Sequence, residues 1–553
     1  MNNRSIYTFL IGFAILTQVV FAGTTGKLSG RLTNKETGEP LIGANVMIEG
    51  TVLGAATDTE GNYFILQIPP GSYTVRFTMI GYQTMVMNDV RLRVDLTTTL
   101  DGQLVESAVG LEEVIVQAER PMIQTDVTYS QANISSEEVD MLPVEEFEDV
   151  LALQAGVVST GGEIHVRGGR GGEISYMVDG ITVTDPYNSG MAVEIENNAI
   201  QELQFISGTF NAEYGQAMSG IVNIVTKDGD FSKYSGSIST SVGDYYISSD
   251  RVSFANSSYP LFPQVDNLNL DNITDIKANI EGPIIPGTLS FFVSGRRKKN
   301  NGYLFGEQIF YPNSYLWSDV QNMFLIDPEV GLGNGDQLLQ DSLWSPANYQ
   351  DSLLVYIDSL RNNNQFDWIS MNTSDQLTYQ AKFSWRVTPR IKFGYNRMFS
   401  DTRSQSYSHG YRWNPEGRPH SFNTRTGDIV RADISINQST FANIMFSNAV
   451  NHYRTHLSSD PNFYTFIDEL SFEDGYWSSD TLDPEDAAIY DTDPRIFDYA
   501  TGNNYEVGGN YMDIYNRKSI VRTIKGELTS QYNRAHQLKF GAEYRTTDIT
   551  YNS

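Results

Sequence analysis

The residues whose types could support chemistry are concentrated between positions 146 and 227. Arg167, Arg170, Glu173 and Asp179 stand there among glycines, next to short β-type runs. No nucleophile, base and orienting group occur together in this stretch, as covalent catalysis would require. Asp179 and Gly180 form a common tight-turn pair. The stretch is therefore expected to place charges on the tight turns of a small mixed sheet.

Known catalytic and metal-binding motifs are missing from the sequence. It contains no P-loop, GxSxG, HExxH or EF-hand pattern. His452 and His456 have the spacing of a helical metal site, but on a strand they would lie roughly 13 Å apart. Asp58, Glu60 and Asn62 lack the full ligand series of a calcium loop and indicate a tight turn. We expect no catalytic residues, no metal site, no cofactor and no enzymatic activity.

The composition narrows the class of protein. The chain has 553 residues, with 67 Asp and Glu against 38 Lys and Arg, and no cysteine. The acidic balance argues against a nucleic-acid partner, because phosphate contacts need a basic face. It fits solvated loops, or attraction of a cationic partner as the alternative. With 32 Tyr, 28 Phe and 46 Gly, the chain is expected to be mainly β.

Two segments precede the charged stretch. Residues 1–22 have a basic start, a short apolar run and a small-residue end, which is typical of a cleaved signal peptide. Residues 26–104 contain short β-type runs separated by turn signals, which predicts a small β-sandwich. Its strands are expected at 27–33, 44–48, 55–58, 63–68, 71–79 and 95–100.

The charged stretch carries a family resemblance. In order, it contains an LQAGV start, an IHVRGG step, a YMVDGITV step and a closing EYGQAMSGIVNIVTK. These pieces resemble the plug domain of TonB-dependent outer-membrane receptors, which we place at residues 125–229. Short helices are expected from Ser135, with serine as the cap and acids in the first turn, and over residues 144–153.

The N-terminal sandwich carries a second resemblance. Residues 30–83 are similar to the regulatory-like β-sandwich first described beside metallocarboxypeptidases. That family's catalytic domain is absent, so the resemblance implies a fold and not peptidase activity. The same domain often precedes the plug in outer-membrane receptors of Bacteroidetes-like bacteria.

An extended segment at residues 111–121 lies between the two domains. It reads LEEVIVQAERP and resembles a TonB box, which would pair by β-augmentation with a TonB-type energy-coupling protein. The alternatives are the last strand of the sandwich or a plain linker. The residues expected to bind the partner are Glu112, Glu113, Val114, Ile115, Val116 and Gln117.

The plug resemblance also implies roles for individual residues. Arg167 and Glu213 are the candidates for tying the plug to the barrel wall. The loops at 169–173 and 185–190 correspond to plug apices that face the extracellular cavity. Arg170, Tyr187 and Asn188 are therefore the candidate ligand contacts, although Tyr and Asn in a turn are commonly turn residues alone.

Residues 231–553 show repeated two-residue alternation. Nine strands are expected, joined alternately by short and long connections, as in outer-membrane barrels. Alternation alone does not decide between such a barrel and a soluble sandwich. An open sheet in lipid leaves unpaired backbone groups, so we expect the chain to be the N-terminal piece of a longer receptor. The predicted strands are 233–243, 273–282, 288–298, 376–387, 390–400, 430–437, 440–456, 517–532 and 537–550.

Together these features predict a sandwich, an α+β plug and the first strands of an antiparallel transmembrane β-barrel. The expected function is energy-coupled uptake of a scarce substrate across the bacterial outer membrane, with the sandwich and TonB box in the periplasm. A siderophore, cobalamin, an oligosaccharide and a peptide all remain open as the extracellular small ligand. The other expected partners are outer-membrane lipid and a candidate lid lipoprotein. The alternative is a non-transporting cell-surface scaffold.

Overall fold

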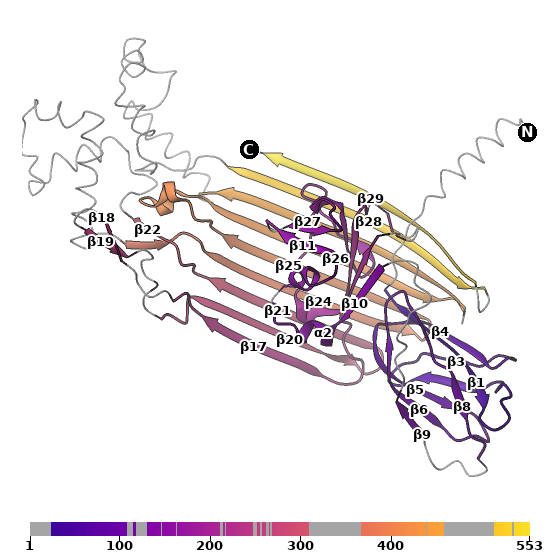
Figure 1. The fold of residues 1–553 in the computed structure, drawn as a ribbon. Coiled ribbons are helices and arrows are strands. Elements are labelled where there is room, and N and C mark those ends of the chain that lie inside the picture. Colours follow the sequence, from indigo (N-terminus) through magenta and orange to yellow (C-terminus); the bar gives the residue numbers. More distant parts are fainter. Residues whose placement is uncertain are drawn as a thin grey trace, which may run out of the picture.

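Alternating sequence patterns place most of this chain in strands, which form three parts in Figure 1. The computed structural model describes residues 24–107, 114–117, 130–308, 367–457 and 514–552, except for short gaps at 145, 162, 209, 211–213, 216, 247–250, 255–256, 261–264, 266–267, 438 and 533–535. The predicted signal peptide, Glu112, Glu113 and Glu213 lie outside the described residues.

The N-terminal part is a two-sheet sandwich whose inward residues form one apolar core, which includes Leu28, Leu32, Val75 and Phe77. One sheet contains β1 (Gly26–Asn34), β4 (Asn62–Ile68), β7 (Thr97–Thr99) and β8 (Gly102–Leu104). The other has the order β3-β2-β5-β6-β9, with β2 (Asn45–Ile48), β3 (Gly54–Ala56), β5 (Gly71–Thr78), β6 (Met85–Leu92) and β9 (Val114–Gln117).

Two sandwich strands, β6 and β8, were not among the predicted strands. In β6 the run Met85-Val86-Met87 does not alternate, and Asn88-Asp89 reads as a turn. The structure accommodates this pair inside the strand, because Asp89 takes a left-handed φ of 58° and the register with β5 shifts there. Asp58 accepts hydrogen bonds from the backbone N–H groups of Glu60 and Asn62, as the tight-turn interpretation expects.

The plug is a five-stranded mixed sheet with two short helices. Its strand order is β10-β15-β16-β13-β14, and β13 runs parallel to β16. Ser135 caps α2 in a capping box with Glu138, as the Ser-x-x-Glu spacing predicts. The elements are β10 (Ser130–Ser135), α2 (Ser136–Met141), α3 (Phe147–Ala152), β13 (Ile174–Val178), β14 (Ile181–Thr182), β15 (Ile200–Ser207) and β16 (Gly220–Thr226).

The third part is a curved antiparallel sheet of nine strands joined in sequence order. All nine predicted strands are confirmed, and most are longer than predicted, β26 by ten residues at its start. They are β17 (Ser235–Gly243), β20 (Ile273–Ile285), β21 (Leu289–Asn300), β24 (Ser374–Thr388), β25 (Ile391–Ser404), β26 (His420–Ser435), β27 (Thr440–His456), β28 (Tyr515–Gln531) and β29 (Gln537–Asn552).

Short strands and 3-10 helices complete the three parts. They are β11 (Val157–Thr160), β12 (Glu163–Val166), β18 (Arg251–Phe254), β19 (Ser257–Pro260), β22 (Phe305–Gln308), β23 (Asp367–Ser370), η1 (Gly171–Glu173), η2 (Asn197–Ala199), η4 (His409–Tyr411) and η5 (Pro415–Gly417).

The two faces of the nine-stranded sheet distinguish a barrel wall from a soluble sandwich, which alternation alone did not. In β24, Phe383 and Trp385 are exposed on one face, whereas Gln380, Lys382 and Ser384 are buried on the other. The buried, polar face lies against the plug, since Lys382 bonds plug residues directly. A soluble sandwich would bury its apolar face instead. Apolar-out and polar-in is the pattern of outer-membrane barrel strands.

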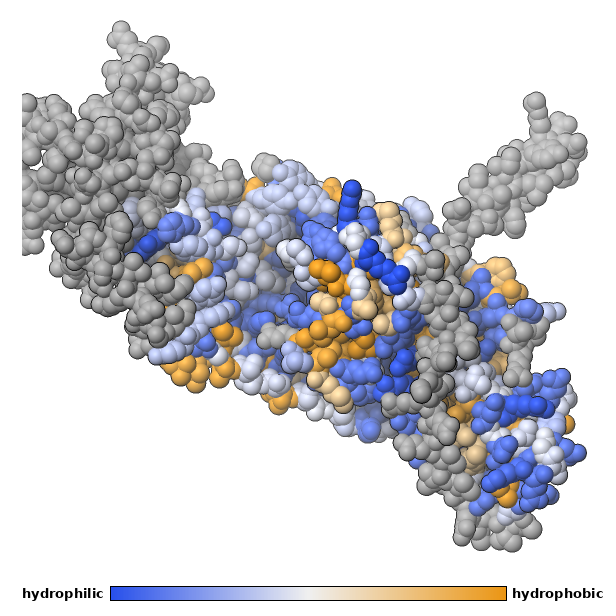
Figure 2. All heavy atoms as spheres, viewed as in Figure 1, coloured by the Kyte–Doolittle hydropathy of each residue, from blue (hydrophilic) through white to orange (hydrophobic). Residues whose placement is uncertain are grey.

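The two ends of the sheet differ. The connections at 286–288, 389–390, 436–439 and 532–536 are short and share one end, where the sandwich lies in Figure 1. The longer connections leave from the opposite end. In Figure 2 the sandwich surface is largely hydrophilic, whereas apolar side chains gather over the plug. Among the residues that the structure describes, no helix is long and apolar enough to cross a membrane.

Candidate functional site

A buried lysine on the sheet joins the plug to the wall. The Lys382 ammonium, on β24, lies 3.1 Å from the Asp179 carboxylate and 3.0 Å from that of Asp228. Lys392 on β25 also pairs with Asp228, just beyond the last plug strand. Burial raises the pKa of Asp228, but the two ammonium groups outweigh burial and hold it well below its usual range. The Asp228 carboxylate therefore stays ionised, and both carboxylates pair with the wall.

The Asp179–Gly180 turn is held from several sides. Asp179 has a left-handed φ of 49° and accepts hydrogen bonds from the Thr226 backbone N–H, at 2.9 Å, and from its hydroxyl, at 2.8 Å. The Asn396 amide of β25 donates to the same carboxylate at 3.1 Å. From β28, the Lys525 ammonium donates to the Gly180 carbonyl at 2.7 Å. This turn is thus anchored to three wall strands.

Two further carboxylates of the plug meet arginines of the wall. The buried Arg296 guanidinium lies 2.8 Å from Asp275 on the neighbouring strand and 3.1 Å from Glu196 of the plug. Burial raises the pKa of Glu196, and the positive charge of Arg296 opposes that effect. Arg425 on β26 lies 3.1 Å from Glu194. The plug therefore presents carboxylates and the wall presents cations at these contacts.

A polar cavity of about 450 Å³ lies at this contact, between plug and wall. Its lining includes Glu194, Glu196, Arg296 and Arg425, together with Tyr453 near the end of β27. These wall residues lie toward the strand ends that lead into the longer connections. The cavity has the size of a small-molecule site and carries both signs of charge.

The plug loop at 185–190 reaches the wall next to this cavity. The Arg517 guanidinium carbon lies 4.3 Å from the centre of the Tyr187 ring, which fits a cation–π contact. The same guanidinium lies 3.8 Å from the Asp185 carboxylate. Asn451 donates to Asp185 at 2.6 Å, and the Tyr187 and Tyr515 hydroxyls lie 3.4 Å apart.

The predicted ligand contacts lie on two plug loops that are neighbours, because a Cβ at Gly172 would lie 3.2 Å from the Ser189 hydroxyl. Tyr187 is half-exposed beside the wall. Asn188 accepts a hydrogen bond from the Gly190 backbone N–H at 3.1 Å, as a turn residue does. Arg170 is exposed, and its carbonyl accepts from Glu173 at 3.1 Å. Their contact with a ligand stays a prediction.

The sequence predicted that charged residues tie the plug to the wall, but it named Arg167 and Glu213. Arg167 is exposed, has a left-handed φ of 49° and lies beside Gly208 within the plug. Sequence reasoning did not assign the carboxylates that meet the wall in the structure. Asp179 and Asp185 offered a signal, because each is an acid at the end of a β-type run followed by a turn. The ion pairs between plug and wall include Lys382–Asp179, Lys382–Asp228, Lys392–Asp228, Arg296–Glu196, Arg425–Glu194, Arg517–Asp185 and Lys298–Glu146.

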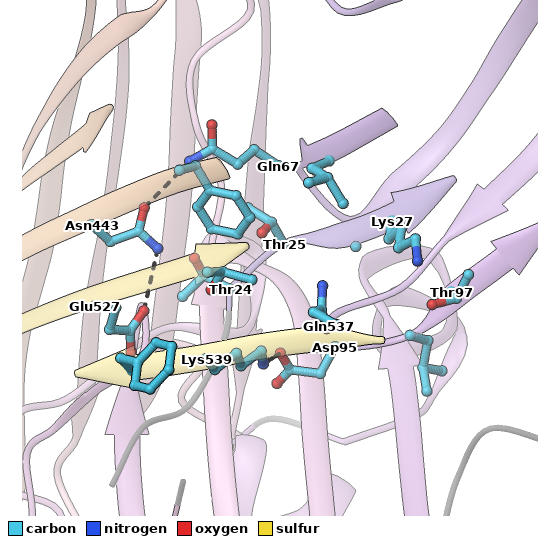
Figure 3. A pocket seen from close by; sticks show the side chains of 16 residues that line it. Thr24, Thr25, Lys27, Gln67, Asp95, Thr97, Asn443, Glu527, Gln537 and Lys539 are labelled. Atoms are coloured by element: carbon cyan, nitrogen blue, oxygen red, sulfur yellow. Dashed lines mark hydrogen bonds and ion pairs between the residues drawn. The ribbon is translucent and has the colours of Figure 1, made fainter. Parts of the chain in front are cut away.

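The sandwich is docked on the short-turn end of the wall. Figure 3 shows the small pocket at this junction, about 60 Å³ in volume. The Asp95 carboxylate lies 3.6 Å from the Lys539 ammonium of β29 and 3.1 Å from the Tyr214 hydroxyl of the plug. Gln67 accepts a 2.7 Å hydrogen bond from the Ser435 hydroxyl. Asp95 and Gln67 both adopt left-handed φ values, Gln67 where the register of β4 with β1 shifts, so the sandwich contacts the wall through residues with a strained backbone.

A chain of polar contacts runs from this junction to the plug turn. Gln67 donates to Asn443 at 3.4 Å, and Asn443 donates to Glu527 at 3.2 Å. Glu527 lies 2.8 Å from Lys525, which bonds the Gly180 carbonyl. The sandwich, the wall and the plug are therefore linked by one continuous set of side chains.

The sandwich also contacts the plug directly. Glu202 of β15 is buried and accepts a 3.1 Å hydrogen bond from the Val94 backbone N–H. The Asn133 amide donates to the same oxygen. Burial raises the pKa of Glu202 to about 7, although these hydrogen bonds oppose the shift.

The TonB-box-like segment forms β9 at the edge of a sandwich sheet. Residues Val114–Gln117 pair in parallel with β6, with Met85 opposite Val114 and Asn88 opposite Gln117. This position agrees with the alternative that the segment is the last sandwich strand, and it leaves the segment extended as a TonB box requires. Its binding role stays a prediction.

The contacts between plug and wall pair opposite charges and leave polar surfaces around the cavity. Within the described residues, no group of three or more His, Asp or Glu side chains has the arrangement of a metal site. This geometry holds a plug in a wall and leaves a polar cavity beside it.

Comparison with known proteins identifies two domains. Residues 28–116 match the CarboxypepD_reg-like domain, and residues 123–222 match the TonB-dependent Receptor Plug Domain. The chain is 27% identical over 258 residues to the TonB-dependent transporter Oar of Myxococcus xanthus, a match that covers 45% of this chain and 24% of that protein. It is 30% identical over 228 residues to the TonB-dependent receptor SusC of Bacteroides thetaiotaomicron, covering 37% of this chain and 22% of that protein.

Two solved structures that align with parts of the chain are a transporter and a receptor. The outer membrane transporter YddB of Escherichia coli aligns with a TM-score of 0.45 and 11% identity, over 76% of this chain and 48% of YddB. The siderophore receptor PirA of Acinetobacter baumannii aligns with a TM-score of 0.43 and 12% identity, over the same shares. The chain thus spans about half the length of these proteins, and its matches span about a quarter of its curated relatives.

Proposed function

We propose that this chain, which carries the plug domain of a TonB-dependent receptor, acts in energy-coupled uptake of a scarce substrate across the bacterial outer membrane. The observation that carries the proposal is the plug seated against the polar face of a sheet whose opposite face is apolar. A gated transporter needs a wall that faces lipid and a polar plug that can be moved aside.

The proposed cycle uses binding and force and involves no covalent chemistry on the substrate. Substrate binds at the long-loop end, in the cavity beside Glu194 and Arg425. A TonB-type protein pairs with residues 112–117 at the opposite end and pulls on the plug. The ion pairs around Asp179 and Glu196 are the contacts that such a pull must break. Each is a side-chain pair that reforms without backbone rearrangement.

The competing proposal is a surface scaffold that binds partners without transport. A scaffold has no need of a separate domain held by buried ion pairs inside a wall, so the Lys382 cluster favours the transporter.

Deleting residues 112–117 tests the proposal. Uptake of a labelled substrate by cells should be abolished, while substrate binding to the purified full-length receptor stays unchanged. The matched control is Glu112→Gln with Glu113→Gln, which keeps the backbone that β-augmentation uses and should retain uptake. Uptake that survives the deletion would show that the segment is not the coupling site.

The substrate class is open between a siderophore, cobalamin, an oligosaccharide and a peptide. Calorimetric titration of the full-length receptor with iron–siderophore complexes, cobalamin and a glycan set would assign it. Arg425→Ala should weaken binding of the responding ligand, because its guanidinium lines the cavity. Arg170→Ala and Tyr187→Ala test the contacts predicted from the sequence. A response to none of the three classes would direct attention to a peptide or to a lid lipoprotein.

A further inference from the structure

The edge position of β9 bears on how an energy-coupling protein would engage the receptor. β9 (Val114–Gln117) is the last strand of the order β3-β2-β5-β6-β9, and one of its edges pairs with β6. Within the described residues, no strand pairs with its other edge. An edge strand presents a row of unpaired N–H and C=O groups, which is a template for another strand.

We propose that a TonB-type sheet adds to the open edge of β9 while β9 stays paired with β6, so that the sandwich serves as a preorganised docking platform. This inference rests on the proposed function, because it takes the partner from it. It goes further in assigning the sandwich a role, namely to present the strand that the partner binds.

Preorganisation is the physical reason. A free peptide loses backbone entropy when it becomes a strand. The β6–β9 ladder has already fixed four residues, Val114–Gln117, before a partner arrives. Binding an ordered strand therefore costs less than ordering a linker.

The docking of the sandwich adds to this advantage. Asp95 and Gln67 fix the sandwich on the wall, and the Val94 N–H fixes it on Glu202 of the plug. The open strand edge is thereby held at the short-turn end of the wall, away from the long connections. This is the end at which a periplasmic partner would approach.

An engineered disulfide separates this mechanism from one in which the partner pulls β9 off β6. Asn88 and Gln117 face each other in the ladder, Asn88 is exposed, and the chain has no cysteine of its own. Asn88→Cys with Gln117→Cys in the full-length receptor should lock β9 to β6. The matched control is Met47→Cys with Arg76→Cys, a facing pair between β2 and β5.

The measurement is affinity for a purified C-terminal domain of a TonB-type protein, with each variant oxidised and then reduced. We expect the oxidised lock to bind within about threefold of its reduced form, as the control does, which is a difference of less than 1 kcal/mol. A loss of more than about tenfold on oxidation, restored by reduction, would show that β9 must leave β6 and would overturn the inference.

Hydrogen exchange on the unmodified receptor gives an independent reading. Addition of the TonB domain should slow exchange at Val114–Gln117 and leave Met85–Asn88 unchanged. Faster exchange at Met85–Asn88 would overturn the inference while the proposed function stands. No binding of the TonB domain to the unmodified receptor would overturn both.

Discussion

Lys382 is the residue at which the plug and the wall are most closely joined. Its ammonium is buried between Asp179 and Asp228 and donates to the Thr226 carbonyl at 3.1 Å. A buried ion pair of this kind contributes little relative to an apolar replacement of the whole pair. Removing one partner is different, because the other charge is left buried without compensation.

Lys382→Met should therefore lower the free energy of unfolding by about 3–5 kcal/mol, measured by denaturant titration of the full-length receptor in detergent. Combining it with Asp179→Asn should cost less than the sum of the single changes, because the two side chains interact. Additive costs would mean that Lys382 and Asp179 are not coupled.

Glu202 should make the stability of the receptor depend on pH. Its pKa is raised to about 7 in the folded protein by burial, whereas the unfolded chain has the ordinary value near 4.5. Between these values the folded state binds the extra proton, so the stabilising effect is present at low pH and is lost as pH rises through 7. Glu202→Gln should remove this dependence.

The check is the denaturation midpoint of both proteins at pH 5.5 and 8.5. A fall of the same size in wild type and in Glu202→Gln would assign the pH dependence to other groups.

At the scale of elements, the sequence predicted the strands well because each wall strand repeats its two-residue alternation over a dozen positions. It missed β6, whose Asn88-Asp89 pair imitates a turn, and it began β26 at 430 although the strand starts at His420. Residues such as Phe422 and Thr424 extend β26 because neighbouring strands supply hydrogen-bond partners, which local sequence does not reveal.

The candidate site was less predictable than the strands. The family resemblance implied that an acidic residue of the plug contacts the wall. The identity of that residue depends on where the plug sits in the wall, which the sequence does not reveal. Asp179 reads as a turn residue, and Lys382 as one of many lysines on alternating strands. Only the register of β24 against the plug brings Lys382 to Asp179, two residues separated by 203 positions.

Strand alternation yields a prediction about lipid. Phe446, near the middle of β27, is exposed on the apolar face of the wall. Phe446→Arg should destabilise the receptor in vesicles by about 2–4 kcal/mol, the cost of arginine near the middle of a bilayer.

His452 lies on the same face, nearer the end of β27 at His456. His452→Arg should therefore cost about 0–1 kcal/mol. Denaturant unfolding in vesicles measures both. Equal costs would argue that this face does not meet a lipid interior.

At the scale of the whole molecule, polar side chains join the sandwich to the wall and to the plug, whereas the plug also packs against apolar wall residues such as Phe292 and Met398. Asp95 takes part in two of these joins, to Lys539 and to Tyr214. Polar interfaces of this kind are suited to domains that separate and redock.

Asp95→Ala should loosen the docked sandwich. Amide exchange at residues 24–27 and 66–68 should rise about five- to tenfold, which corresponds to about 1 kcal/mol of lost docking energy. Asp89→Ala is the matched control, because Asp89 has the same left-handed backbone but bonds Ser72 within the sandwich. A rise in both variants would trace the effect to the sandwich fold and not to its docking.

Among the residues that the structure describes, the ion pairs between plug and wall share one polarity, because the carboxylates come from the plug side and the cations from the wall. If the plug moves aside, its negative charges leave with it. These strands would then line an opening with Lys382, Lys392, Arg425 and Arg517, while Arg296 would stay paired with Asp275 of the wall. Such an opening would carry a positive electrostatic potential along this part of its length, which draws anions and repels cations. Its ionic conductance would favour anions, and that preference would fade as added salt screens the lining.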